Sequence, residues 1–217
     1  LPPLSLALIA SQPQHVVDLT RIVVVEALRS AGLNLPFPDC GVTIGSSRSC
    51  QSTWERFTSN SAVKPDLTNW LDTLPHSPAI DTARYIGSRS ALLAPMAACA
   101  TGIWSIAQAI NLIRSGACER AIAGSVEAPI TPLTIAGFTQ MGALATTGCY
   151  PFDLQREGLV LGEAGAVFML ETAELARSRG AKIYGEILGF GLTNDAYHMC
   201  AMDLEGTAAR NAIYQCL

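Results

Sequence analysis

The sequence predicts an α/β protein in which helices cover a layered sheet. Apolar segments of strand length alternate along the chain with segments whose apolar residues recur at helical spacing. Several strand-like segments are apolar almost throughout, which is typical of strands buried on both faces. Hydrophobic residues make up 49% of the 217 residues and charged residues 15%, so the chain can form a sizeable core.

The elements follow from periodicity and from the glycines that end them. Helical spacing and a following glycine or preceding prolines predict helices over residues 16–31, 100–115, 131–138 and 172–179, and another helical pattern begins near Gly206. Apolar or alternating segments predict strands over residues 4–10, 41–45, 91–97, 120–124, 165–170 and 183–190.

Residues 50–90 are less regular. Aromatic and apolar side chains there indicate short helices or a lid, and prolines interrupt the periodicity: Trp54, Phe57, Trp70 and Leu71, with Pro65, Pro75 and Pro78. Two interpretations stay open. The segment is either a surface excursion with aromatic anchors or a functional wall, at a dimer contact or a pocket.

Composition excludes several classes of function. The net charge is −4 with no run of Lys or Arg, which argues against nucleic acid as a partner. Seven single cysteines without a C-x-x-C pair argue against a disulfide scaffold, and no His/Cys cluster has metal-ligand spacing, so we expect no metal. The odd number of single cysteines also favours the reducing cytosol as the location of the protein.

No membrane segment or signal peptide is expected. Residues 91–107 form the most apolar stretch, but Pro95, Thr101 and Ser105 interrupt it, so a buried strand followed by a buried helix explains it better than a span. The chain begins at Leu1 within a strand-like segment, without a basic region or a cleavage pattern. Both ends of the sequence look cut.

The common nucleotide motifs are missing. Gly189-Phe190-Gly191 lacks the third glycine of a dinucleotide fingerprint, and neither a Walker loop nor a G-x-S-x-G elbow occurs, so no cofactor is expected. Glu163 lies in the glycine-rich run 158–165 among apolar residues, where a buried carboxylate needs a partner. We interpret it as a structural carboxylate tied to backbone or Arg, with a catalytic acid as the alternative.

Cys99 is the candidate nucleophile. It lies between the strand-like run that ends at Ala97 and the helix that follows, where free N–H groups and the helix dipole favour a thiolate. A buried structural cysteine is the alternative. His15 and His76 are expected at the surface. His198 would be the base of a Cys99–His198 dyad, although a lone loop histidine is more often solvated or a supporting group.

Four motifs in order over residues 84–217 resemble the β-ketoacyl-acyl carrier protein synthases, in particular their elongating type II branch. The first, residues 96–102, resembles the nucleophile region, and residues 123–132 resemble the segment that follows the nucleophilic helix. The third combines 151–153, 156–158 and 162–165, and the fourth is 193–199.

The resemblance implies a thiolase-like α-β-α-β-α fold of two stacked halves, with residues 1–217 forming the N-terminal domain and 183–217 beginning the second half. It implies that Cys99 accepts the acyl group, with its own N–H as an oxyanion donor, before decarboxylative condensation with malonyl-carrier. The family's two malonyl-binding histidines belong to the second half, and His198 matches a different histidine. This chain alone is therefore expected to accept an acyl group but not to condense.

The resemblance also implies partners and a location. They are an acyl carrier protein bearing acyl or malonyl groups, a second copy in a homodimer, and the cytoplasm, or a plastid in a eukaryote. A non-catalytic partner that sets chain length, a polyketide-type ketosynthase and a thiolase on the same fold are the alternatives. Cys99 argues against the first, because such partners usually replace the nucleophile. An isolated half should expose an apolar face and aggregate.

Overall fold

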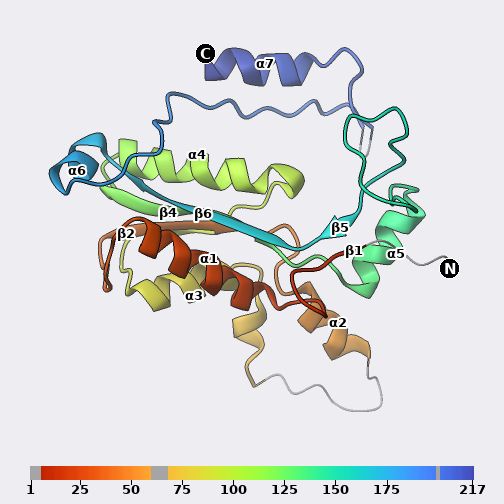
Figure 1. Ribbon diagram of the computed structural model, residues 1–217, viewed down its shortest axis with the longest axis horizontal. Coiled ribbons are helices and arrows are strands. Elements are labelled where there is room, and N and C mark those ends of the chain that lie inside the picture. The colour runs from red at the N-terminus through yellow and green to blue at the C-terminus, as the bar shows by residue number, and fades with distance from the viewer. Residues whose placement is uncertain (1–5, 60–67, 199–200) are drawn as a thin grey trace. The chain divides into compact units, whose positions relative to one another are not determined.

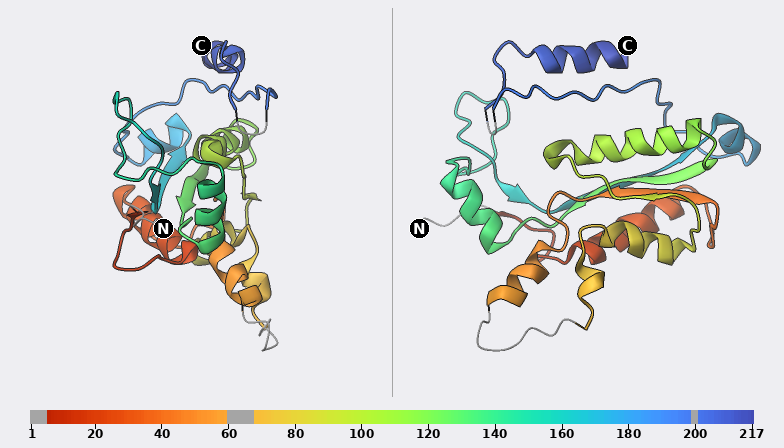
Figure 2. Two further views of the ribbon diagram at one scale, coloured as in Figure 1. Left: turned by 90° about the vertical axis from the view of Figure 1, so that its right-hand side faces the viewer. Right: turned by 180° about the vertical axis from the view of Figure 1, so that it is seen from behind.

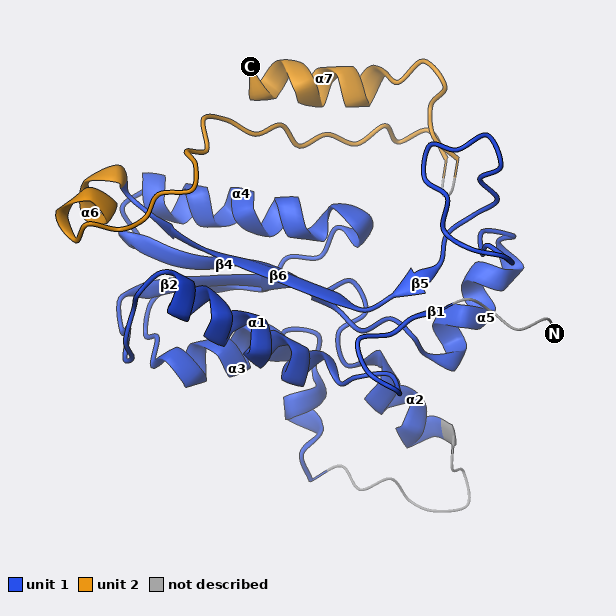
Figure 3. Cartoon of the chain, viewed as in Figure 1, with its two compact units in different colours: residues 1–172 blue, residues 173–217 orange. Residues whose placement is uncertain are grey.

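The computed structural model describes residues 6–59, 68–198 and 201–217. The chain divides into two compact units, residues 1–172 and 173–217, which Figure 3 shows in different colours. Part of the predicted strand 4–10, Pro65, and Met199 and Cys200 after His198 lie outside the described residues. No helix in the described ranges is long and apolar enough to cross a membrane.

The first unit is built on a four-stranded sheet. Its strands are β2 (Cys40–Gly45), β3 (Leu92–Leu93), β4 (Arg120–Glu127) and β6 (Ala164–Glu171), in the order β3-β2-β4-β6. β2 pairs in parallel with β3 and β4, and β6 runs antiparallel to β4. A separate parallel pair joins β1 (Leu6–Ala7) to β5 (Leu161–Gly162).

Helices cover both faces of this sheet (Figure 1). α1 (Val16–Ser30) and α3 (Ser77–Ile86) lie on one face, and α4 (Thr101–Arg114) lies on the other. The view from behind in Figure 2 shows the same three layers. α2 (Gln51–Ser59), the short 3₁₀ helix η1 (Trp70–Thr73) and α5 (Pro132–Gln140) complete the unit.

The two faces of the sheet differ in side-chain size. On the α1–α3 face, Val42, Ile44 and Ile122 pack with Val24, Leu28 and Ile86. On the α4 face, Ala121 and Ala123 alternate with Ile122 and pack with Ala109 of α4. Successive strand residues point to opposite faces, so this alternation separates a bulky side from a small-residue side. Small residues let α4 approach the sheet closely.

Most predicted elements are confirmed in type and place. α1, β2, α4, β4, α5, β6, α6 (Ala173–Ser178) and α7 (Thr207–Cys216) lie within a few residues of the predicted segments. β4 is three residues longer at its C-terminal end than predicted because it pairs with β6 along its whole length. Gly32 and Gly180 adopt positive φ just beyond α1 and α6, as expected of residues that end helices.

Three strand predictions were wrong in extent or type. Residues 91–97 are not a buried strand, because only Leu92–Leu93 pairs with β2 at the sheet edge, and Pro95 has no N–H to donate. The first strand shrinks to Leu6–Ala7 in its described part. Residues 183–190 form no strand, since no other strand pairs with them among the described residues. A strand needs such a partner for its backbone hydrogen bonds.

Residues 50–90 contain a helix of the core, α3, where the sequence predicted only short helices or a lid. Pro78 lies in the first turn of α3, which begins at Ser77, and does not interrupt the helix, because the N–H groups of the first turn have no partner within the helix. Ala79, Thr82 and Ile86 of α3 are buried. The tryptophans agree better with the prediction of a surface excursion, since Trp54 donates from Nε1 to Thr73 Oγ1 at 3.1 Å and Trp70 is half exposed.

The second unit contains α6, an extended segment and α7. The extended segment lies against α7, where Leu192 N donates to Gln215 Oε1 at 3.2 Å and Thr193 Oγ1 donates to Ala208 O at 2.8 Å. Gly191 is required at this contact, because a Cβ there would lie 1.8 Å from Ala212 O.

Candidate active site at the start of helix α4

Cys99 lies at the tip of a tight turn that leads into α4. The turn is a short 3₁₀ helix, η2 (Ala98–Ala100), which continues directly into α4 at Thr101. Cys99 is exposed, so the interpretation of Cys99 as a buried structural cysteine is wrong. Within the described part of the chain, the Cys99 N–H forms no hydrogen bond, which leaves this donor available at the surface.

The backbone of this turn is unusual at Ala98. Its φ is +47°, in the left-handed region that residues other than glycine rarely adopt. The side chain of Thr101 bridges the residues around it: Ala97 N donates to Thr101 Oγ1 at 3.0 Å, and Thr101 Oγ1 donates to Ala98 O at 2.6 Å. The turn that presents Cys99 is thus closed by one buried hydroxyl.

The N-terminal turns of α4 are seated on the small-residue face of the sheet. Thr43 Oγ1 of β2 donates to Ser105 O at 2.9 Å. Gly102 lies against Ser125 of β4, whose Oγ would be 2.8 Å from a Cβ at position 102. Gly45, at the end of β2, leaves room for Pro95 and Thr101. These contacts fix the start of the helix relative to two strands.

These supporting residues were not predicted from the sequence. Thr43 and Gly45 occur in a predicted strand, whereas Ser125 lies just beyond the end of the next one. Nothing in the sequence pairs any of the three with α4. The signal available was the small size of alternate residues in β2, Gly41, Thr43 and Gly45, which permits close helix approach.

The other described cysteines separate into two groups. Cys40, Cys50 and Cys118 are buried, whereas Cys149 and Cys216 are exposed like Cys99. Burial raises the pKa of Cys40 to about 11 and also raises the pKa of Cys50 and Cys118. Because the thiolate is the nucleophile, these three thiols are poor candidates for acyl acceptors.

The histidines have local roles. His15 is half-buried rather than at the surface: it caps α1, with Nδ1 accepting from Val17 N at 3.4 Å, and its Nε2 lies 3.3 Å from Thr53 Oγ1. His198 is exposed in the second unit, and its Nδ1 accepts from Ala201 N at 3.1 Å. The Cys99–His198 dyad stays a prediction. No group of three or more His, Cys, Asp or Glu in the described residues is arranged to hold a metal.

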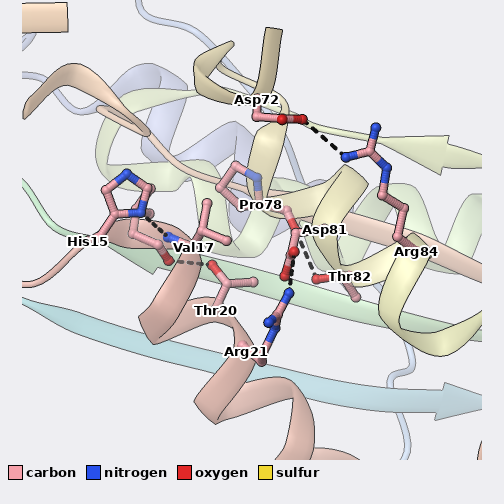
Figure 4. Close-up of polar contacts among 10 residues, drawn as sticks. His15, Val17, Thr20, Arg21, Asp72, Pro78, Asp81, Thr82 and Arg84 are labelled. Atoms are coloured by element: carbon pink, nitrogen blue, oxygen red, sulfur yellow. Dashed lines mark hydrogen bonds and ion pairs between the residues drawn. The ribbon is translucent and has the colours of Figure 1, made fainter. Parts of the chain in front are cut away.

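His76 lines a hollow of about 490 Å³ between α1, η1 and α3. Like His15, it was predicted at the surface but is half-buried. Figure 4 shows two ion pairs near this hollow: Arg21 with Asp81 at 2.5 Å and Arg84 with Asp72 at 3.1 Å. Three of these four side chains are more than half exposed, so the pairs contribute little to stability. Cys99 does not line this hollow.

Glu163 joins two distant segments. Glu163 is 7% exposed, and its carboxylate accepts hydrogen bonds from Gln14 N at 2.6 Å and from Ile9 N at 3.3 Å. Backbone N–H groups therefore partner this carboxylate, as the structural interpretation predicts, and they hold the chain before α1 against the start of β6.

Glu157 organises the exposed loop over residues 146–157. Its carboxylate accepts hydrogen bonds from the backbone N–H groups of Thr146 and Thr147, at 3.1 and 2.8 Å, and from both threonine hydroxyls. The Thr146 hydroxyl, followed by that of Thr147, lowers the pKa of Glu157 from 4.5 to about 2. The hydrogen bonds of the loop therefore stabilise the charged carboxylate of Glu157.

We expect these loop hydrogen bonds to weaken in acid. A lowered pKa means that the contribution is complete above the ordinary value of 4.5 and is lost as the pH falls through about 2. NMR titration should place the Glu157 midpoint well below 4, and the protection factor of the Thr147 amide against hydrogen exchange should fall over that range. Glu157→Gln should show the low protection factor at neutral pH already. A midpoint near 4.5 would contradict the expectation.

The first unit, in which α4 covers one face of the sheet and α1 and α3 cover the other, has the thiolase-like layered α/β fold. Solved ketosynthases have the same fold. A type II polyketide ketosynthase, solved with its acyl-carrier protein as AntDE:AntF, matches with a TM-score of 0.87 and 26% identity over 97% of this chain and 58% of that one. A β-ketoacyl synthase from Burkholderia phymatum matches with a TM-score of 0.80 and 27% identity over 93% of this chain and 53% of that one.

Residues 10–176 match the family described as β-ketoacyl synthase, N-terminal domain, and the chain belongs to this family. A 3-oxoacyl-[acyl-carrier-protein] synthase 2 of Staphylococcus aureus is 41% identical over 133 residues, which are 59% of this chain and 33% of that protein. The protein of the same description from Mycobacterium bovis is 38% identical over 147 residues, which are 64% and 35% of the two chains. The chain thus matches about a third of the length of these curated relatives.

Proposed function

We propose that this chain is the N-terminal part of a β-ketoacyl-[acyl-carrier-protein] synthase of fatty acid biosynthesis, an acyltransferase in which Cys99 accepts the acyl group. The observation that carries the proposal is the exposed Cys99 at the start of α4, in a chain of the β-ketoacyl synthase family. Relatives at 38–41% identity named 3-oxoacyl-[acyl-carrier-protein] synthase 2 support the fatty acid context.

The first step is a transfer between thioesters. The Cys99 sulfur attacks the carbonyl carbon of the acyl-carrier thioester, a new C–S bond forms, and the carrier thiol leaves with the proton that Cys99 gives up. Negative charge develops on the carbonyl oxygen in the transition state. The free N–H of Cys99 and the N-terminal end of α4 would stabilise that charge.

Condensation would follow with malonyl-carrier. Loss of CO₂ gives a carbanion that attacks the acyl carbonyl, and the Cys99 thiolate leaves as the new carbon–carbon bond forms. The resemblance assigns the histidines for this step to the second half of the fold, which residues 183–217 would only begin. We therefore expect acylation without condensation from these 217 residues.

The proposed partners are an acyl carrier protein and a second copy of the chain. One structural neighbour is a ketosynthase in complex with its acyl-carrier protein, which supports the first. The outer edge of β3 has no partner strand among the described residues, and such edges readily pair with another chain. We place the protein in the cytoplasm because its cysteines follow the pattern of a reducing compartment.

A polyketide ketosynthase is the second candidate. It is favoured by two structural neighbours, the AntDE:AntF ketosynthase and the ishigamide ketosynthase/chain length factor, the latter 28% identical with a TM-score of 0.80 over 92% of this chain and 53% of that one. The higher identity to the fatty acid synthases argues for the first candidate.

Acyl transfer is tested directly by incubating the chain with an acyl-carrier thioester and locating the acyl mass by peptide mapping. We expect one acyl group, on Cys99. Acylation of Cys149 or Cys216 instead, or of no residue, would overturn the proposal. Comparing saturated acyl chains with β-ketoacyl chains as donors separates the fatty acid from the polyketide candidate.

A further inference from the structure

We propose that Thr101 is a positioning residue for acyl transfer, because its buried hydroxyl holds the backbone turn that presents Cys99. This inference rests on the proposed function of Cys99. The side chain of Thr101 does not reach the surface, being 2% exposed, so it acts through the turn rather than on the acyl group.

The hydroxyl makes two hydrogen bonds that together span Cys99. It accepts from the N–H of Ala97, two residues before Cys99, and donates to the C=O of Ala98, one residue before it. The Thr101 backbone N–H donates to the same Ala98 carbonyl. Both the donor and the acceptor capacity of the hydroxyl are thus used within one turn.

The residue that Thr101 holds in this way, Ala98, has a strained backbone. Ala98 has a φ of +47°, a conformation that a residue with a Cβ adopts only when its surroundings impose it. Strained backbone of this kind is frequent where a side chain must be presented to a reactant. Without the Thr101 hydroxyl, Ala98 loses a hydrogen bond that favours this conformation, and Cys99 loses its fixed direction.

Two neighbours fix Thr101 in turn. Its methyl group faces Gly45, since a Cβ at position 45 would lie 2.4 Å from Thr101 Cγ2, and Ser105 Oγ donates to Thr101 O at 2.9 Å. The methyl thus packs against β2 while the hydroxyl closes the turn. Valine keeps the packing and loses the hydroxyl, and serine keeps the hydroxyl and loses the methyl.

The test compares Thr101→Val, Thr101→Ser and a matched control, Thr20→Val. Thr20 is fully buried in α1, on the other face of the sheet, and its hydroxyl also donates to a helix carbonyl, Val16 O at 2.7 Å. Acylation of Cys99 by a short acyl thioester is measured over a range of thioester concentrations. We expect about a tenfold lower maximal rate for Thr101→Val with an unchanged half-saturating concentration, and rates within about twofold of the parent for Thr101→Ser and Thr20→Val.

A second measurement separates this inference from the proposed function. Iodoacetamide alkylation of Cys99 is followed in the same samples, with the exposed Cys149 and Cys216 as internal references. The ratio of the Cys99 rate to the reference rates should fall several-fold in Thr101→Val alone. An unchanged ratio and an unchanged acylation rate would overturn the role of Thr101. Absence of acylation in the parent chain, with the alkylation difference retained, would overturn the acyl-transfer function and leave the positioning role.

Discussion

Replacing Cys99 with serine is expected to lower acyl transfer at least about 1,000-fold. A hydroxyl is a weak nucleophile unless an adjacent base takes its proton, whereas a thiol supplies a reactive thiolate at neutral pH. His15 does not supply such a base, because its ring caps α1 and lies beside Thr53. The rate of acyl incorporation from a carrier thioester, measured by intact mass, gives the comparison.

Cys149→Ser is the matched control, since Cys149 is also exposed and lies in the same unit. It should acylate at the rate of the parent chain. Thermal unfolding of both variants should coincide with that of the parent, because neither exposed side chain contributes to the core. Retention of acyl transfer in Cys99→Ser would remove the basis for assigning Cys99 as the acceptor.

Replacing Gly45 with alanine should lower the stability by about 3 kcal/mol and should disturb the nucleophile turn as well. A Cβ at this position would lie 2.3 Å from Pro95 O and 2.4 Å from Thr101 Cγ2. One of these contacts is backbone, so relief requires β2 and the segment before Cys99 to separate. Overpacking of this kind typically costs about 1–3 kcal/mol. For a chain of this size the melting temperature should fall by about 6–12 °C.

Gly137→Ala provides the control. Gly137 lies inside α5, and no atom outside its own helix comes within 4 Å of the Cβ position. Alanine there should leave stability unchanged or raise it by up to about 1 kcal/mol, because alanine favours helix. The decisive comparison is denaturant unfolding of the two variants. Equal stabilities would show that β2 and the Cys99 turn are not in tight contact.

Much of the fold was predictable because its signals are local. The helix at 16–30 has a buried apolar stripe and ends before Gly32, which reaches positive φ. β2 is buried throughout and β4 is buried along most of its length, and mostly apolar runs are typical of such strands. The strand expected over 183–190 failed because its apolar pattern says nothing about whether another strand pairs with it.

The structure added what the pattern could not contain. α3 was not predicted because Pro75 and Pro78 indicate a break in a helix. Pro78 is compatible with α3 because it lies in the first turn, and only the structure shows that position. The direction of β6 was also undetermined, since its apolar run indicates a strand but does not show which strand it pairs with or in which direction. Such features depend on neighbours that are distant in the sequence.

The sequence alone determined the candidate nucleophile, the alternation of strands and helices, and the resemblance to the β-ketoacyl synthases, because each rests on residues that are close along the chain. Only the tertiary structure decided how Cys99 is presented. The left-handed Ala98, the hydroxyl of Thr101 that closes the turn, and the space left by Gly45 act together across two elements. Their effect depends on close packing between β2 and α4, and packing is a property of segments that meet only after the chain has folded.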